Sequence, residues 1–232
     1  MTGATAPPAP RAAIFDWDNT LIDSWAIIHD AMNTTLAAMD HPPWSYDETR
    51  ARVRRSLREA FPELFGARWG EARDIFYGRF RAIHLEGLTA LPGAESLLAA
   101  LVGRGVYLAV VSNKHGEHLR AEVRHLGWDG YFGRVVGATD AARDKPDPDP
   151  VRLALEGSLI AAGRMVWFVG DTAIDIECAR NSGCVPVLVR ESPPESGEFA
   201  EMDGIFHFPD RWALESLVRA LPAPISGRNP SF

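Results

Sequence analysis

Short apolar runs, each followed by polar residues, recur along the chain. They lie at residues 12–15, 106–111, 134–138, 165–169 and 185–189, with a shorter run near 205–206. An uninterrupted apolar run of this length is typical of a strand that is buried on both faces, as in a parallel sheet. We therefore predict a strand at each of these positions.

Between these runs, apolar residues recur at the spacing of a helix. The segments with this pattern are residues 24–39, 45–60, 70–84, 94–102, 115–126, 151–162 and 210–221. Phe61-Pro62 is expected to end the second of these helices. Strands that alternate with helices predict a parallel sheet with helices on both faces.

One block departs from the alternation. Residues 23–88 contain helical patterns and no convincing strand, directly after the first strand. We predict a small helical cap domain there, inserted over the carboxyl ends of the strands. The expected fold is therefore α/β, with a discontinuous, doubly wound, Rossmann-like core formed by residues 11–22 and 89–222. Residues 1–10 and 223–232, rich in Pro, Gly, Ser and Ala, are expected to be unstructured tails.

Composition excludes several classes of protein. The chain has 232 residues, 46% of them hydrophobic, and a formal net charge of −7, which disfavours a nucleic-acid partner. No apolar run approaches the length of a membrane span, and the first ten residues do not resemble a signal peptide. Two cysteines, Cys178 and Cys184, provide neither a disulfide framework nor metal-site spacing. We expect a cytoplasmic monomer or homodimer without a membrane partner.

Lysine is rare. Among 24 basic residues, lysine occurs only at positions 114 and 145, and arginine occupies every other basic position. Lysine provides a compact ammonium, whereas arginine provides a planar fork. Lys114 and Lys145 are therefore candidates for sites that need a point charge.

Carboxylates and other polar groups follow three of the predicted strands. Asp16 and Asp18 follow the first; taken alone, they fit an Asx-turn as well as a metal site. The other groups are Ser112, Asn113 and Lys114 after the second strand, Lys145 in a Pro/Asp-rich loop, and Asp171, Thr172 and Asp175 after the fourth. Since parallel strands end at one edge of a sheet, these groups can converge, and together they predict a Mg²⁺ and phosphate site.

These motifs, in this order, resemble those of the haloacid dehalogenase superfamily of aspartate-nucleophile phosphatases. They are DWDNTL, SNK, Lys145 within DKPDP, and GDTAID. FDWDNTLIDS and SNK are most similar to the phosphoglycolate phosphatase-like subgroup, which has a helical cap directly after the first motif. The resemblance implies a Mg²⁺-dependent phosphatase that acts on a small phosphorylated metabolite through an aspartyl-phosphate.

The resemblance also implies roles for individual residues. Asp16 would be the nucleophile, and Asp18 would be the general acid and base. Lys145 would neutralise charge and contact the phosphoryl group together with Thr20, Ser112 and Asn113. Asp16, Asp18 (through its backbone carbonyl) and Asp171 would hold Mg²⁺, and Asp175 would support them from behind. Arg54, Arg55 and Arg58 in the cap are candidate specificity residues, although such a run is more often a solvated face.

Other activities share these motifs. A sugar phosphomutase of the β-phosphoglucomutase type has the same fold and cap, and SNK weakly favours hydrolysis over it. A dehalogenase is disfavoured because it needs no acid such as Asp18. A non-catalytic binding module of this fold would be expected to have lost a motif.

The remaining residues have plain structural interpretations. Asn19 stands where the family usually has glycine, and asparagine tolerates the positive φ expected there. Trp17 is bulky and bears on how a substrate fits. His115 and His118 are expected to be surface residues at the start of a helix, and the two cysteines to be buried thiols.

Overall fold

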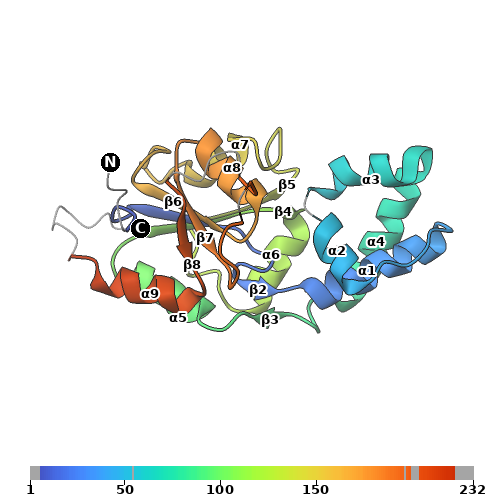
Figure 1. The fold of residues 1–232 in the computed structure, drawn as a ribbon, viewed down its shortest axis with the longest axis horizontal. Helices are drawn as coiled ribbons and strands as arrows, with labels where there is room; N and C mark the ends of the chain where they lie inside the picture. Colours follow the sequence, from blue (N-terminus) through green and yellow to red (C-terminus); the bar gives the residue numbers. More distant parts are fainter. Residues whose placement is uncertain (1–5, 54, 196, 200–203, 223–232) are drawn as a thin grey trace.

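β1 (Ala12–Phe15) is a central strand of a parallel sheet in the computed structural model, which describes residues 6–53, 55–195, 197–199 and 204–222. The sheet has six strands in the order β5-β4-β1-β6-β7-β8 (Figure 1). The other strands are β4 (Tyr107–His115), β5 (Arg134–Ala138), β6 (Val166–Gly170), β7 (Val185–Val189) and β8 (Phe206–Phe208). The chain adds strands on one side of β1 and then crosses to the other, which creates a switch point where ligands bind in such sheets.

Both faces of the sheet are covered, as the apolar runs predict. Ala13 and Phe15 of β1 face a core shared with α5, α6 and α9, whereas Ala12 and Ile14 face one shared with α7 and α8. These helices are α5 (Ala94–Val102), α6 (Gly116–His125), α7 (Asp149–Leu155), α8 (Ala173–Asn181) and α9 (Arg211–Ala220). The α/β fold class predicted from the sequence is confirmed.

A helical insertion, residues 24–88, lies beside the sheet (Figure 1). It contains α1 (Trp25–Ala38), α2 (Tyr46–Arg52), α3 (Leu57–Phe65), the short 3₁₀ helix Gly66–Arg68 and α4 (Trp69–Ile83), which share a hydrophobic core of their own. The chain enters it through β2 (Ile22–Asp23) and leaves through β3 (Thr89–Ala90), which pair antiparallel.

The single helix predicted at 45–60 is wrong. Two helices occupy this region, and α3 continues through Pro62 instead of ending there. Phe61 and Phe65 lie one helical turn apart and are both buried in the core of the insertion. Their burial outweighs the backbone hydrogen bond that proline cannot donate. The helix predicted at 151–162 is also shorter, because α7 ends at Leu155.

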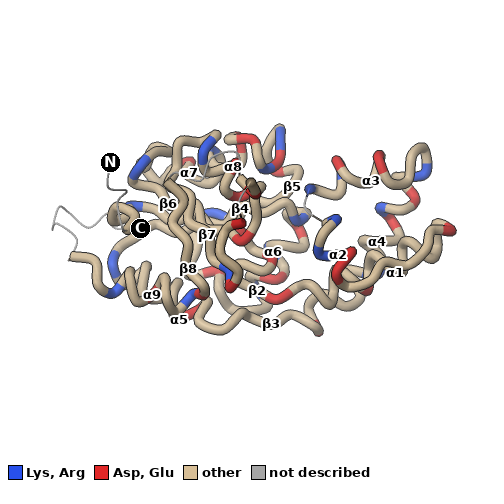
Figure 2. The backbone as a smooth tube through the Cα atoms, viewed as in Figure 1, with Lys and Arg blue, Asp and Glu red and all other residues tan. Residues whose placement is uncertain are grey.

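Acidic and basic segments are interspersed over the sheet and the insertion (Figure 2). Within the described part of the chain, no helix is long and apolar enough to cross a membrane. Of the predicted tails, residues 1–5 and 223–232 lie outside the described residues, and residues 6–10 are described and belong to no helix or strand.

Candidate active site

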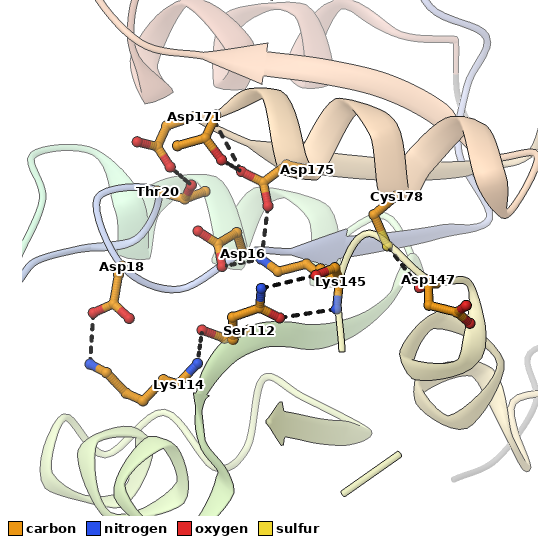
Figure 3. A network of polar contacts seen from close by, with 12 residues as sticks. Asp16, Asp18, Thr20, Ser112, Lys114, Lys145, Asp147, Asp171, Asp175 and Cys178 are labelled. Atoms are coloured by element: carbon orange, nitrogen blue, oxygen red, sulfur yellow. Dashed lines mark hydrogen bonds and ion pairs between the residues drawn. The ribbon is translucent and has the colours of Figure 1, made fainter. Parts of the chain in front are cut away.

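Asp16 and Lys145 form the centre of the site, where β1 ends. Lys145 Nζ lies 2.6 Å from Asp16 Oδ1 and 2.8 Å from Asp175 Oδ1, and Lys145 is only 2% exposed (Figure 3). Burial raises the pKa of Asp16 to about 7, although Lys145 opposes the shift. Burial also disfavours the charged form of Lys145, but Asp16 and Asp175 outweigh it and raise its pKa. Lys145 therefore stays charged in the site.

Three carboxylates come together here. Asp16, Asp171 and Asp175 each offer an oxygen within 4.8 Å of the others. Burial, followed by the charges of Asp175 and Asp16, raises the pKa of Asp171 well above its ordinary value. Thr20 Oγ1 donates to Asp171 Oδ1 at 3.2 Å and is fully buried, so this hydroxyl orients Asp171. Such crowding of carboxylates favours a cation between them.

Asp175 is held by the start of α8. Its Oδ2 accepts a hydrogen bond from the Thr172 backbone N–H at 3.0 Å, as in a capping box, and a second one from Thr172 Oγ1 at 2.7 Å. A Cβ on Gly170 would lie 2.3 Å from the Asp175 side chain, so only glycine allows this carboxylate to fold back toward Lys145.

The second group of site residues, Ser112, Asn113 and Lys114, lies near the end of β4, where the register with β5 shifts between Val111 and His115. Ser112 is 4% exposed, and its Oγ accepts from the Lys114 backbone N–H at 3.2 Å. The Asn113 side chain binds the backbone of Lys145: its Nδ2 donates to Lys145 O at 3.1 Å, and its Oδ1 accepts from Lys145 N at 3.0 Å. Asn113 therefore positions the loop that carries Lys145.

Asp18 points away from the carboxylate cluster. Its Oδ1 lies 2.7 Å from Lys114 Nζ, and the two side chains point toward each other (Figure 3). Asn19 has φ of 62°, the conformation expected for it. Thus the lysines singled out by their rarity each contact one of the two aspartates of the first motif.

Glu122, on α6, was not identified from the sequence. It is fully buried and accepts from Lys114 Nζ at 2.6 Å and Trp17 Nε1 at 2.7 Å, while His84 Nδ1 lies 2.9 Å from its other oxygen. Burial would raise its pKa, but Lys114 and these hydrogen bonds lower it. The available signal was an acidic residue one helical turn from Leu119, on the apolar face of α6.

Trp17 belongs to the core. It is fully buried and packs edge-on against Trp128 and Phe132, so it leaves the substrate space free. The expectation that His115 and His118 lie on the surface is wrong for His118, which is 5% exposed. It packs against the rings of Tyr77 and Phe80 of the insertion, and this tertiary packing cannot be read from local sequence. Cys178 and Cys184 are buried and free, as expected.

The insertion closes over the site and leaves a cavity of about 180 Å³ between α1–α4 and the strand ends. Arg55 lines this cavity and pairs with Glu63. Arg58 instead spans from α3 to the core, with Nε 2.6 Å from the buried Asp144 Oδ2. Arg54 lies outside the described residues.

The chain matches the model of the haloacid dehalogenase-like hydrolase family over residues 13–189. It is 36% identical over 196 residues to phosphoglycolate phosphatase of Rhodospirillum rubrum, covering 78% of this chain and 79% of that protein. It is 33% identical over 184 residues to phosphoglycolate phosphatase of Pectobacterium atrosepticum, covering 76% and 78%.

Solved structures share the fold. A HAD-superfamily hydrolase from Ehrlichia chaffeensis is 28% identical with a TM-score of 0.63, covering 93% of this chain and 98% of that one. A haloacid dehalogenase-like protein from Streptococcus pneumoniae is 22% identical with a TM-score of 0.76, covering 90% and 98%. The motifs, the sheet and these matches agree, and the chain belongs to the haloacid dehalogenase-like hydrolase family.

Proposed function

We propose that this protein is a Mg²⁺-dependent phosphatase that hydrolyses a small phosphorylated metabolite through an aspartyl-phosphate. The observation that supports this most is the contact of Lys145 Nζ with Asp16 Oδ1 at 2.6 Å inside a cluster of three carboxylates. An anionic nucleophile can approach an anionic phosphoryl group only where fixed positive charge offsets the repulsion.

In this proposal Asp16 attacks phosphorus and the alcohol leaves. Asp16 lies at the end of β1, and its backbone N–H donates to Val169 O at 2.8 Å, so the strand fixes its position. Lys145 and the Ser112 hydroxyl contact the phosphoryl oxygens. The structure gives Thr20 and Asn113 other partners, Asp171 and the Lys145 backbone, so we assign them to positioning.

Asp18 lies two residues after the nucleophile and lines the same cavity. We assign it the proton transfers: it protonates the leaving oxygen and then deprotonates the water that hydrolyses the aspartyl-phosphate. Before substrate binds, Lys114 Nζ lies 2.7 Å from Asp18 Oδ1 and fixes the position of this side chain.

The donor set suits a hard divalent cation. Asp16 and Asp171 provide carboxylate oxygens whose pKa values are raised first by burial and further by neighbouring carboxylates, and the backbone carbonyl of Asp18 is the further oxygen implied by the family. Asp175 is occupied by Lys145 and Thr172 and supports the set from behind. A bound Mg²⁺ would offset this charge and polarise the phosphoryl group.

The relatives named phosphoglycolate phosphatase make phosphoglycolate the first metabolite to test. The buried, unpaired cysteines agree with an enzyme of the reducing cytoplasm.

The test measures phosphate released from p-nitrophenyl phosphate and phosphoglycolate, with Mg²⁺, by the wild type and by Asp16→Asn. An amide cannot attack phosphorus, so we expect a loss of more than about 10⁴-fold. Asp74→Asn, on the exposed side of α4, is the matched control and should retain activity. Intact mass after rapid quenching should show a phosphoryl adduct on the wild type only. An Asp16→Asn enzyme that retains a few per cent of the rate would refute the proposal.

A further inference from the structure

The part of the cavity formed by the insertion is mostly apolar. Side chains from α1, α3 and α4 line it opposite the catalytic residues, and each is less than a tenth exposed: Ile28, Met32, Phe61, Phe76 and Phe80. Three of them are aromatic rings in contact with one another. Phe76 lies edge-on to Phe61, with 5.7 Å between the ring centroids, and is stacked with Phe80, with 5.8 Å between the centroids.

The basic groups of this cavity already have anionic partners. Among its described residues, each lysine and arginine is paired: Lys145 with Asp16, Lys114 with Asp18 and Glu122, Arg52 with Glu48, and Arg55 with Glu63. Arg52 and Arg55 are about half exposed, with side-chain exposures of 51% and 48%, so they lie on the solvent side. The His118 ring is neutral near pH 7, because burial lowers its pKa to about 4.

This lining disfavours a substrate with a second anionic group. Burying a carboxylate without a cationic partner is costly, and so is burying a sugar hydroxyl against Ile28, Phe61 and Phe76, whose side chains offer it no hydrogen bond. Binding of an apolar group becomes more favourable in proportion to the area that it buries. Aromatic rings that pack edge-on or stacked also favour contact with another flat ring.

We propose that the preferred substrate is the phosphomonoester of an alcohol that carries an aromatic ring or an apolar group of similar size. This group lies against α1, α3 and α4, while the phosphoryl group faces Asp16. The inference rests on the phosphatase activity proposed above, and it distinguishes this enzyme's substrate from phosphoglycolate, which carries a carboxylate besides its phosphate and gives its name to the relatives.

The first experiment compares kcat/KM for benzyl phosphate, ethyl phosphate and phosphoglycolate on the wild-type enzyme with Mg²⁺. Benzyl alcohol and ethanol are similarly weak acids, so the benzyl/ethyl ratio reports binding of the ring and not leaving-group reactivity. We expect benzyl phosphate to exceed both other compounds by at least ~10-fold, the discrimination that an apolar pocket typically provides. Phosphoglycolate equal to or better than benzyl phosphate would overturn the inference while leaving the phosphatase activity intact.

If none of these compounds, nor p-nitrophenyl phosphate, released phosphate, the proposed phosphatase activity itself would fail, and this inference with it.

A second experiment tests binding of the ring to the cavity with a matched pair of variants. Ile27 and Ile28 are neighbours in α1 with 5% and 8% exposure, but only Ile28 lines the cavity.

Ile28→Ala should lower the benzyl/ethyl ratio several-fold, whereas Ile27→Ala should leave that ratio unchanged. Ile28→Val and Ile27→Val serve if the alanine variants do not fold. Equal ratios in the two variants would show that the ring binds elsewhere and would overturn the inference.

Discussion

Lys145 is enclosed by two carboxylates, and its effect depends on size as much as on charge. Its Nζ lies 2.6 Å from Asp16 and 2.8 Å from Asp175, and the side chain is 2% exposed, so no space remains for a longer group. A charge acting only at long range would tolerate arginine, whereas a contact would not.

We therefore expect Lys145→Arg to lower kcat by more than about 10²-fold, the cost of losing one preorganised contact to the transition state. Steady-state phosphate release measures it, with circular dichroism as the check on folding. An arginine enzyme with nearly full activity would show that Lys145 acts only through its charge.

Because His118 is buried, we expect the free energy of unfolding to depend on pH. Burial first, and then the neighbouring His84 and His115, lower the pKa of His118 to about 4 in the folded state, against about 6.5 in an unfolded chain. Between these values the unfolded state binds more protons, so stability falls as pH falls from about 6.5 to 4.

His118→Phe keeps a ring in this aromatic cluster but cannot take up a proton. Its urea midpoint should decline less steeply than that of the wild type over this pH range. Parallel curves for the two proteins would show that His118 does not contribute to the acid sensitivity.

At the scale of elements, Glu122 joins α6 to the insertion and to the first motif. Its two oxygens contact His84, just after α4, as well as Lys114 and Trp17. Local sequence patterns rarely reveal such a residue, because its partners His84, Lys114 and Trp17 lie 38, 8 and 105 positions away in the sequence.

Glu122→Gln removes the negative charge beside Lys114. It also places an amide NH₂, which is a hydrogen-bond donor, next to groups that are themselves donors. Breaking one partner of a buried ion pair typically costs ~3–5 kcal/mol, so we expect a loss of about that size in the free energy of unfolding. Urea denaturation measures it. Glu117→Gln, exposed in the first turn of the same helix, is the control and should change little; similar losses in both would rule out the buried network as the cause.

Arg58 and Arg55 make separable contributions, although both belong to α3 and the segment before it. Arg58 pairs with Asp144, the residue before Lys145, whereas Arg55 pairs with Glu63 inside the insertion. We expect Arg58→Ala to depress turnover of both a metabolite and p-nitrophenyl phosphate several-fold, because the Lys145 loop loses a support.

Arg55→Ala should leave kcat for both substrates nearly unchanged and alter at most KM, since Arg55 pairs with Glu63 on the solvent side of the cavity and does not contact the catalytic core. Comparing kcat and KM for both substrates in the two variants checks this. An Arg58→Ala enzyme with unchanged turnover would show that the ion pair does not position the loop.

The elements that were predicted well are those fixed by local pattern. The strands Arg134–Ala138 and Val185–Val189 and the helix Ala94–Val102 have the predicted bounds, because continuous or periodic burial determines each. The division between α2 and α3 was not predictable, since it depends on packing within the insertion. In the site, strand ends located Asp16, Asp18, Lys114 and Asp171, and the rarity of lysine singled out Lys145 in its loop. Asn113 and Thr20 instead contact Lys145 and Asp171, which depends on tertiary contacts.

At the scale of the whole molecule, the sheet carries the charged residues of the site at its strand ends, and the helical insertion lies over them. Three carboxylates crowd at the strand ends beneath an apolar lining. A cation that binds only the folded state stabilises it by mass action, by about 2.7 kcal/mol at 100 times its dissociation constant.

We therefore expect chelation to abolish turnover and to lower the Tm, and Mg²⁺ to restore both. Ca²⁺, with its looser coordination, should raise the Tm without restoring activity. Asp171→Asn should remove most of the Mg²⁺-dependent rise in Tm, which tests the site apart from activity. A Tm that is indifferent to Mg²⁺ in the wild type would argue against a metal at these carboxylates.

The rarity of lysine has a practical consequence for the chemistry of the protein surface. Lys114 and Lys145 have side chains only 6% and 2% exposed, and every other basic side chain is a guanidinium. Reagents that acylate amines therefore find the amino terminus and otherwise two ammonium groups enclosed beneath the helical insertion. Because Lys145 is enclosed by Asp16 and Asp175, we expect its acylation to be slow in the folded protein, so the rate of labelling at this residue would report how often its ammonium becomes accessible.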